Sequence, residues 1–480
     1  MEKAITRFAP SPTGYIHIGN VRSAIYPYLV ARQTNGKIIL RIEDTDRERY
    51  VEGATELIED TLKWLGLDWD EGPLVGGPNE PYFQTERLSI YMEWVQKLLD
   101  SGRAYADPTP PEKIDEYRKE CNEKKVPFLY RNFRPENTPT WEPGIPIRFK
   151  AEPKEYSWHD EVMGDMHTGP EVLDDIILIK RDGYPTYNFA HIVDDAEMGV
   201  THVMRGVEYL SSTPNYLALY EAFGLERPKL VSLPHILAPI GNKKLGKRDG
   251  AKSVTEYRDD GILPEAILNY LASLGWNDGT EQEIYTKEEL IEKFSIDRIQ
   301  NSGARYDENK LFWMNGQWIR RIFNEQGARA LYDRTINFWP ESASNYPEEY
   351  RIKVLSIIYD RLKTLSDLKD MTNYFFEDPK IDTDIIKNNK FLKKMSEAEV
   401  EELLKKSIDA LAGLKEWDAE YLQETLNGLL AESGKKPAEL FSLIRIALSF
   451  APFSPALNLT LEVLGRETSL ARLNAVARSI

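Results

Sequence analysis

The segment PSPTGYIHIGN, from Pro10 to Asn20, places a histidine and two glycines before an expected helix. Backbone N–H groups at a helix N-terminus bind phosphate, and His17 would add a side-chain donor there. Gly14 and Gly19 would let a ligand approach the backbone closely. A lone histidine before a helix is more often a cap or a surface group, so the segment predicts a phosphate site only in the company of other charged residues.

Charged residues of suitable types occur elsewhere in the chain. Lys244 and Lys247 lie in a glycine-flanked loop and, as mobile point charges, suit a triphosphate. Arg7 and Arg205 suit carboxylates, and Glu43 suits an ammonium group. Together these residues predict a site for an acidic amino acid and a nucleotide. No Ser-His-Asp or Cys-His pairing is visible in the sequence, so we expect positioning and electrostatics to carry the chemistry.

The elements that must position these residues alternate over the first eighty residues. The expected order is strand, helix, strand, helix, at residues 4–11, 19–36, 37–44 and 52–67. A nearly apolar strand such as 37–44 suits a parallel sheet that is covered on both faces. This order predicts an α/β domain with a doubly wound parallel sheet.

The alternation is interrupted and then returns. Residues 78–182 contain proline-rich connections and short strand candidates, which predict an insertion with a small fold of its own. Two further strands, THVMRG and PKLVSLPHILAP, flank a helix and resume the order. Beyond about residue 254 the chain is expected to be helical.

The strand ends bring the charged residues to one place. Ligands of open parallel sheets bind at the carboxyl ends of the strands, where helix N-termini also point. Arg7, Glu43, Arg205 and the loop of Lys244 all fall at such ends. Because four charged positions fall at strand ends in this way, we interpret His17 as a ligand-binding residue rather than a cap or a surface group. Together these positions predict a single ligand site.

Composition limits the classes of protein that the chain can represent. Its 61 basic and 78 acidic residues give a net charge of −17, which argues against non-specific adhesion to nucleic acid or membrane, but not against local phosphate contacts. The single cysteine, Cys121, excludes a disulfide framework and a thiolate-rich zinc site.

No apolar run approaches the roughly 18 to 20 residues of a membrane span, so we expect a cytoplasmic protein with no membrane partner. No metal site is expected in the segment 158–167, because His159, Asp160, Asp165 and His167 lie close together there but with poor ligand spacing.

Two short motifs carry a resemblance. HIGN, from His17, and KLGKR, from Lys244, resemble the HIGH and KMSKS motifs of class I aminoacyl-tRNA synthetases. Longer blocks between Thr6 and about Arg320 are similar to bacterial glutamyl-tRNA synthetases and occur in the same order: TRFAPSPTG, RIEDTDRER, LKWLGLDWDEGP, DGYPTYNFAHIVDD and KLGKRDGAKSV. Glutaminyl-tRNA synthetases are also similar, but their first block usually differs from PSPTG.

The resemblance implies a reaction in two steps. ATP and glutamate, with Mg²⁺, form glutamyl-adenylate, and the terminal ribose hydroxyl of tRNA-Glu then takes the glutamyl group. A monomer without zinc is expected. The implied domains are a Rossmann-like catalytic domain at 1–80 and 191–250, an inserted acceptor-end-binding domain at 81–190, a connecting stem-contact domain at 251–320 and an α-helical anticodon-binding region at 321–480.

The resemblance also implies roles in a glutamate pocket. Arg7, assisted by Tyr187, would bind the side-chain carboxylate of the substrate. Glu43 would face the α-amino group. Ser11 and Arg205 would line the same pocket, so five residues from distant parts of the sequence are expected to meet.

An ATP site is implied next to that pocket. His17 and Gly19 match the ATP-binding turn, and Lys244 and Lys247 match the lysines of the second motif. The implied catalytic residues are His17 and these two lysines. Gly246 stands where the motif usually has serine, which should loosen the loop and slow activation.

Several alternatives stay open. Arg361 matches a position that contacts the anticodon, with a helix-surface arginine as the equal alternative, and His191 stands where relatives often have asparagine. A non-discriminating enzyme would also charge tRNA-Gln with glutamate. A transferase to a modified tRNA base is disfavoured by the helical C-terminal region. A non-catalytic tRNA-binding paralogue would be expected to lose His17, Lys244 or Lys247, and all three are present.

Overall fold

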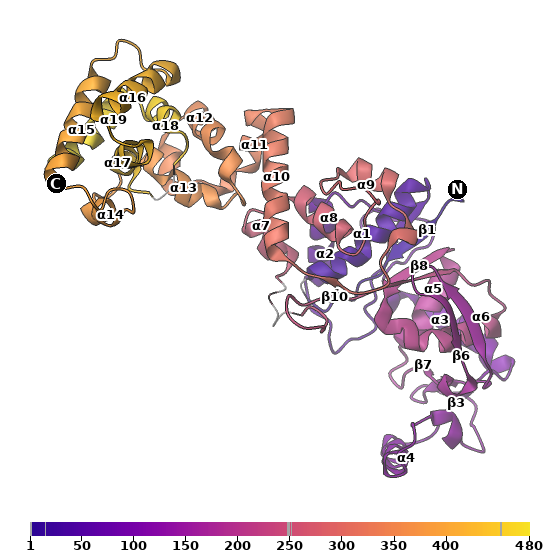
Figure 1. Ribbon diagram of the computed structural model, residues 1–480. Coiled ribbons are helices and arrows are strands. Elements are labelled where there is room, and N and C mark those ends of the chain that lie inside the picture. Colours follow the sequence, from indigo (N-terminus) through magenta and orange to yellow (C-terminus); the bar gives the residue numbers. More distant parts are fainter. Residues whose placement is uncertain (1, 15, 247–249, 251, 452–453) are drawn as a thin grey trace. The chain divides into compact units, whose positions relative to one another are not determined.

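The computed structural model describes all residues of the chain except 1, 15, 247–249, 251 and 452–453 (Figure 1). The described residues form two compact units. The first comprises Met1–Glu256 with Ile267–Glu308, and the second comprises Tyr257–Ala266 with Asn309–Ile480. Within the described chain, no helix has both the length and the apolar character needed to cross a membrane.

Strands and helices alternate at the start of the chain, as predicted. The elements up to residue 240 are β1 (Ile5–Phe8), α1 (Ile18–Gln33), β2 (Lys37–Leu40), α2 (Ala54–Trp64), α3 (Leu88–Asp100), β3 (Ala104–Ala106), α4 (Pro111–Glu123), β4 (Ile147–Phe149), β5 (Tyr156–Asp160), β6 (Gly164–Thr168), β7 (Ile177–Ile179), α5 (Tyr187–Glu197), β8 (His202–Gly206), α6 (Thr213–Phe223), β9 (Lys229–Leu233) and β10 (Ile236–Leu237).

Helices dominate the rest of the chain. The elements that follow are α7 (Val254–Asp259), α8 (Pro264–Ser273), α9 (Lys287–Lys293), β11 (Ala304–Arg305), α10 (Glu308–Gln326), α11 (Ala328–Arg334), α12 (Glu348–Ile358), α13 (Asp367–Phe376), α14 (Thr383–Asn388), α15 (Glu397–Ala412), α16 (Ala419–Ser433), α17 (Pro437–Ser449), α18 (Leu457–Leu464) and α19 (Arg466–Ala477). The prediction of an entirely helical chain beyond residue 254 was wrong at β11, which pairs in parallel with β10.

The strands that carry the predicted site residues are parallel. β1 pairs with β2, and β8 pairs with β9. The backbone N–H of Thr201, just before β8, donates to the carbonyl of Ile5 at 2.9 Å and so links β8 to β1. The predicted parallel α/β sheet is confirmed.

The second strand is shorter than predicted but still delivers its acidic residue. Regular pairing of β2 ends at Leu40. The backbone N–H groups of Arg41 and Glu43 nevertheless donate to the carbonyls of Phe8 and Pro10, each at 3.0 Å. Glu43 is therefore held beside the end of β1, where the strand-end rule places it.

The turn between α1 and β2 depends on two particular residues. Asn35 has a φ of 50°, the left-handed conformation that ends many helices. At Gly36 an added Cβ would lie 1.9 Å from the carbonyl oxygen of Ala4, so only glycine fits. This close approach lets the N–H of Lys37 donate to Ala4 at 2.9 Å and begins the β1–β2 pairing.

The segment expected as an insertion shares its core with the parallel sheet. β3, β4 and β7 form an antiparallel sheet within it, and α4 lies away from β8 (Figure 1). β5 and β6 form an antiparallel hairpin that contains the segment 158–167, with His159 Nδ1 2.7 Å from Asp165 Oδ1. β5 also pairs with β9 in parallel. The expectation of a separate small fold therefore missed the pairing of β5 with β9, because strand partners about seventy residues apart leave no local signal.

The second unit is helical. α15 packs against α19, and α16 packs against α18. A capping box of Ser396 and Glu399 begins α15, as the S-x-x-E pattern favours. Leucine side chains form much of its core, which includes the fully buried Leu404, Leu411, Leu422, Leu443 and Leu473.

Candidate active site

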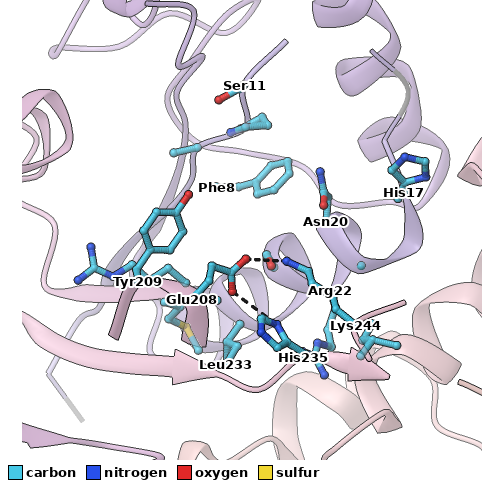
Figure 2. Close-up of a pocket in the computed structure, with 18 of the residues that line it drawn as sticks. Phe8, Ser11, His17, Asn20, Arg22, Glu208, Tyr209, Leu233, His235 and Lys244 are labelled. Atoms are coloured by element: carbon cyan, nitrogen blue, oxygen red, sulfur yellow. Dashed lines mark hydrogen bonds and ion pairs between the residues drawn. The ribbon is translucent and has the colours of Figure 1, made fainter. Parts of the chain in front are cut away.

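A cavity of about 410 Å³ lies in the first unit, beside the ends of β1, β8 and β9 and the start of α1 (Figure 2). Lys247, which was predicted for the same site, lies outside the described residues, and Arg361 belongs to the second unit. The structure brings together the other predicted site residues, all of which line this cavity: Arg7, Ser11, His17, Gly19, Glu43, Tyr187, Arg205 and Lys244.

The start of α1 forms one end of the cavity. His17 immediately precedes the helix and has an extended backbone, with φ −85° and ψ 155°. Gly19 lines the cavity, and a Cβ added to it would meet nothing within 4 Å. The first N–H groups of a helix carry partial positive charge. This end can therefore receive an anion that approaches the backbone closely.

A loop after β10 returns Lys244 to the same end. The N–H of Ala238 donates to the carbonyl of Lys243 at 2.9 Å, and the N–H of Leu245 donates to that of Ile236 at 2.8 Å. These bonds fold the chain back on β10. Lys244 is thus positioned by a hairpin-like turn rather than by a helix or a buried strand.

Glu208 holds Lys244 in this structure. Lys244 Nζ donates to Glu208 Oε1 at 2.7 Å, and His235 Nδ1 lies 3.6 Å from Glu208 Oε2 (Figure 2). Burial raises the pKa of Glu208, but the hydrogen bond from Lys244, a backbone hydrogen bond and the nearby charges of Lys244 and His235 together outweigh it and lower the pKa below its usual value. The Lys244 side chain is 59% exposed, so its ammonium group can exchange one anion for another at little packing cost.

Sequence reasoning did not single out several residues that also line the cavity. Glu208, Tyr209 and His235 follow β8 or β9 directly, so the strand-end rule could have found them. Arg22 follows Gly19 by one turn of α1. Its Nη1 donates to the carbonyl of Leu274 at 3.1 Å, a contact from distant sequence that no local pattern signals.

A buried charge network forms the other end of the cavity. Arg7 Nε donates to Asp195 Oδ1 at 3.1 Å, and Arg7 Nη1 donates to the carbonyl of Met204 at 3.1 Å. Arg41 donates from Nη1 to Asp195 at 2.8 Å and from Nη2 to Glu43 Oε1 at 3.1 Å. All of these side chains are less than a tenth exposed, so their orientations are fixed by one another.

Two carboxylates of this network have pKa values shifted in opposite directions. Burial raises the pKa of Glu43 to about 6, because Arg41 and Arg7 only partly offset the lost hydration. Burial also raises the pKa of Asp195, but Arg7 and Arg41 outweigh it and bring that pKa to about 2. Asp195 is therefore a permanent counter-ion, whereas Glu43 loses its charge in mildly acidic solution.

Aromatic rings surround the second arginine of the cavity. The Arg205 guanidinium carbon lies 4.5 Å from the ring centre of Tyr216 and 5.7 Å from that of Tyr209. Arg205 Nη1 lies 3.2 Å from His191 Nε2. Tyr187 stacks on the His191 ring with centroids 4.7 Å apart. Burial raises the pKa of Tyr187 well above its usual value, so its hydroxyl stays protonated.

Both units match known protein families. Residues 3–313 match the family described as tRNA synthetases class I (E and Q), catalytic domain. Residues 330–477 match the family described as anticodon binding domain.

Curated relatives match nearly the whole chain. A glutamate–tRNA ligase of Dehalococcoides mccartyi strain BAV1 is 39% identical over 480 residues, which cover 98% of this chain and 97% of that one. A glutamate–tRNA ligase of Clostridium botulinum strain Okra is 41% identical over 484 residues, with the same coverage.

A solved structure matches as well. The crystal structure of a glutamate tRNA ligase from Elizabethkingia meningosepticum, in complex with its amino acid, has a TM-score of 0.87 and 32% sequence identity to this chain. The match covers all of both chains.

Proposed function

Because the chain belongs to the class I tRNA synthetases of the E and Q type, we propose that it attaches glutamate to tRNA-Glu with ATP, through glutamyl-adenylate. The relatives named above bear the name glutamate–tRNA ligase. The observation that carries the proposal is the cavity itself. Two buried arginines and a buried glutamate lie at one end, and a helix N-terminus and an exposed lysine lie at the other.

The buried end suits glutamate. Arg7 and Arg205 would receive the side-chain carboxylate, with the protonated Tyr187 hydroxyl as a further donor. Glu43, ionised at neutral pH, would receive the α-ammonium group. Ser11 lines the same space. This arrangement binds the substrate at both charged ends and leaves its α-carboxylate as the group that can react.

The exposed end suits the phosphates of ATP. His17 and the backbone at Gly19 would hold them at the start of α1. Lys244, and Lys247 from the same loop, would stabilise the negative charge that develops as pyrophosphate leaves. When bound with ATP, Mg²⁺ would neutralise part of the phosphate charge, chiefly through phosphate oxygens. For Lys244 to take this role, it must leave Glu208.

The reaction needs no covalent enzyme intermediate. The α-carboxylate oxygen attacks the α-phosphorus of ATP, an anhydride bond forms, and the bond to pyrophosphate breaks. The terminal ribose hydroxyl of tRNA then attacks the activated carbonyl and AMP leaves. The chain's own contribution is to align both reactants and to place positive charge on the leaving phosphates.

The second unit would read the tRNA. It contains the whole of the match to anticodon-binding domains. Arg361, with a side chain 43% exposed, is the residue we propose for an anticodon contact. We also propose the domain boundaries given above, a monomeric enzyme and a cytoplasmic location.

Aminoacylation of two purified tRNAs tests the proposal. The wild-type chain and Lys247→Ala would each be incubated with radiolabelled glutamate, ATP, Mg²⁺ and either tRNA-Glu or tRNA-Gln. Charging of tRNA-Glu alone, lost in the variant, is the expected result. Charging of both tRNAs would identify a non-discriminating enzyme. If neither tRNA were charged, the proposal would fail in favour of a non-catalytic tRNA-binding protein.

A further inference from the structure

The cations around the cavity differ in how their charge is balanced. Arg7 and Arg41 share the carboxylate of Asp195, and Arg41 also binds Glu43. Arg205 is only 9% exposed. Among the described residues, no carboxylate lies within ion-pair distance of it. A buried cation without a counter-ion is costly unless a ligand supplies one, so the charge of Arg205 remains available to a substrate anion.

His191 supplies the one hydrogen-bond acceptor that the described residues offer to Arg205. His191 Nδ1 lies 2.7 Å from the backbone carbonyl of Tyr187, and its Nε2 lies 3.2 Å from Arg205 Nη1. A carbonyl only accepts and a guanidinium only donates. Both bonds therefore form only if the ring is neutral, with its proton on Nδ1 and its lone pair on Nε2.

The surroundings of His191 keep it in that state and in that place. The ring is 1% exposed. It stacks on Tyr187 and makes a T-shaped contact with Tyr216, with ring centroids 4.6 Å apart. Burial and the nearby charge of Arg205 lower the pKa of His191 to about 3, so the ring stays neutral throughout the working pH range.

We propose that His191 is a positioning residue for Arg205, and that it fixes the guanidinium for the side-chain carboxylate of glutamate without contributing a negative charge of its own. This inference rests on the proposed function of the cavity. An acidic residue at position 191 would hold Arg205 equally well but would neutralise it. A neutral acceptor achieves both requirements, since it orients the cation and reserves its charge for the substrate.

A matched pair of substitutions at position 191 separates the effect of orienting Arg205 from the effect of neutralising its charge. Gln and Glu have the same shape, and either can place an oxygen near the position of His191 Nε2. The full-length variants His191→Gln and His191→Glu would be compared by ATP–pyrophosphate exchange with tRNA-Glu present. We expect the KM for glutamate to stay within about threefold of wild type in His191→Gln and to rise at least tenfold in His191→Glu, because only the latter pairs with Arg205. The KM for ATP should stay unchanged in both. Equal values of the KM for glutamate in the two variants would overturn the inference.

A double-mutant cycle tests whether His191 acts through Arg205. His191→Leu removes the acceptor, and should raise the KM for glutamate by about tenfold with little change in the KM for ATP. In an Arg205→Ala background, the same substitution should have less than about a twofold effect. A full effect in that background would show that His191 serves packing, and would overturn the inference. His202→Leu, a substitution of another histidine in the same unit but outside the cavity, is the control.

The cycle also distinguishes failure of the inference from failure of the proposed function. An unchanged KM for glutamate in Arg205→Ala would refute the proposed role of Arg205, and the inference with it. A raised KM in Arg205→Ala, with an unchanged KM in His191→Leu, would refute only the inference. Thermal melting of each variant checks that the fold is retained.

Discussion

The two ends of the cavity bind charged groups in different ways. At the buried end, which we propose for the amino acid and call the amino-acid end, Arg7 lies on β1, Asp195 on α5 and Glu43 just beyond β2. Their buried side chains are held in fixed orientations by hydrogen bonds that run through Arg41. At the exposed end, which we propose for the phosphates of ATP and call the phosphate end, Lys244 is exposed, lies on a loop and pairs with one partially exposed carboxylate, Glu208. The difference matches two tasks. Selecting one amino acid requires fixed geometry, whereas binding and releasing phosphates requires a cation that can change partners.

The largest effect should come from removing the counter-ion of the buried end. Asp195→Asn leaves Arg7 and Arg41 without a shared carboxylate, and breaking a buried pair of this kind costs about 3–5 kcal/mol. Urea unfolding should show a corresponding fall in the free energy of unfolding. Asp46→Asn, which removes an exposed ion pair with Arg49, should change it little. Similar losses in both variants would refute the contrast between buried and exposed charges.

At the phosphate end, Lys244→Ala should affect the rate rather than the fold. Loss of one charge that stabilises leaving phosphate predicts a fall of about 10²–10³-fold in kcat for ATP–pyrophosphate exchange. The KM for glutamate should change by less than about threefold, since the amino-acid end does not depend on this lysine. A large rise in that KM would mean that the two ends are not independent.

The pH dependence should belong to the amino-acid end. Glu43 must be ionised to bind an ammonium group, and its pKa is raised to about 6, so the charged form is lost as pH falls through that value. From pH 7.5 to 5.5, kcat/KM for glutamate should fall about fourfold. Glu43→Gln should bind glutamate weakly but without this pH dependence. A decline that persists in Glu43→Gln would assign the titration to another group.

The smallest effect is expected in the loop itself. Gly246→Ser restricts the backbone next to the motif lysines and adds a hydroxyl, which should speed activation by about two- to threefold. The KM for glutamate should be unchanged in Gly246→Ser. Pre-steady-state measurement of adenylate formation would detect the change. A slower rate would contradict the expectation that glycine at this position loosens the loop.

The sequence predicted the residues that line the cavity better than it predicted the residues that hold their side chains in place. Strand order alone was enough to place Arg7, Glu43 and Arg205 at one edge. The hydrogen-bond partners of these residues could not be predicted, because Asp195, for example, lies 188 residues from Arg7 in the chain. No local pattern signals such a pair. The role of His191 was equally hidden, since its tautomer follows from two hydrogen bonds that only the folded chain contains.

The pairing of β5 with β9 has a mechanical consequence. The N–H of Glu161 donates to the carbonyl of Leu230 at 2.9 Å, and Asp160 Oδ1 accepts from the N–H of Ser232 at 3.2 Å. β9 leads within a few residues to His235 and then to the turn that carries Lys244. The β5–β6 hairpin is thus hydrogen-bonded to the same strand from which that turn extends, so a displacement of the hairpin would act on the segment that leads to Lys244.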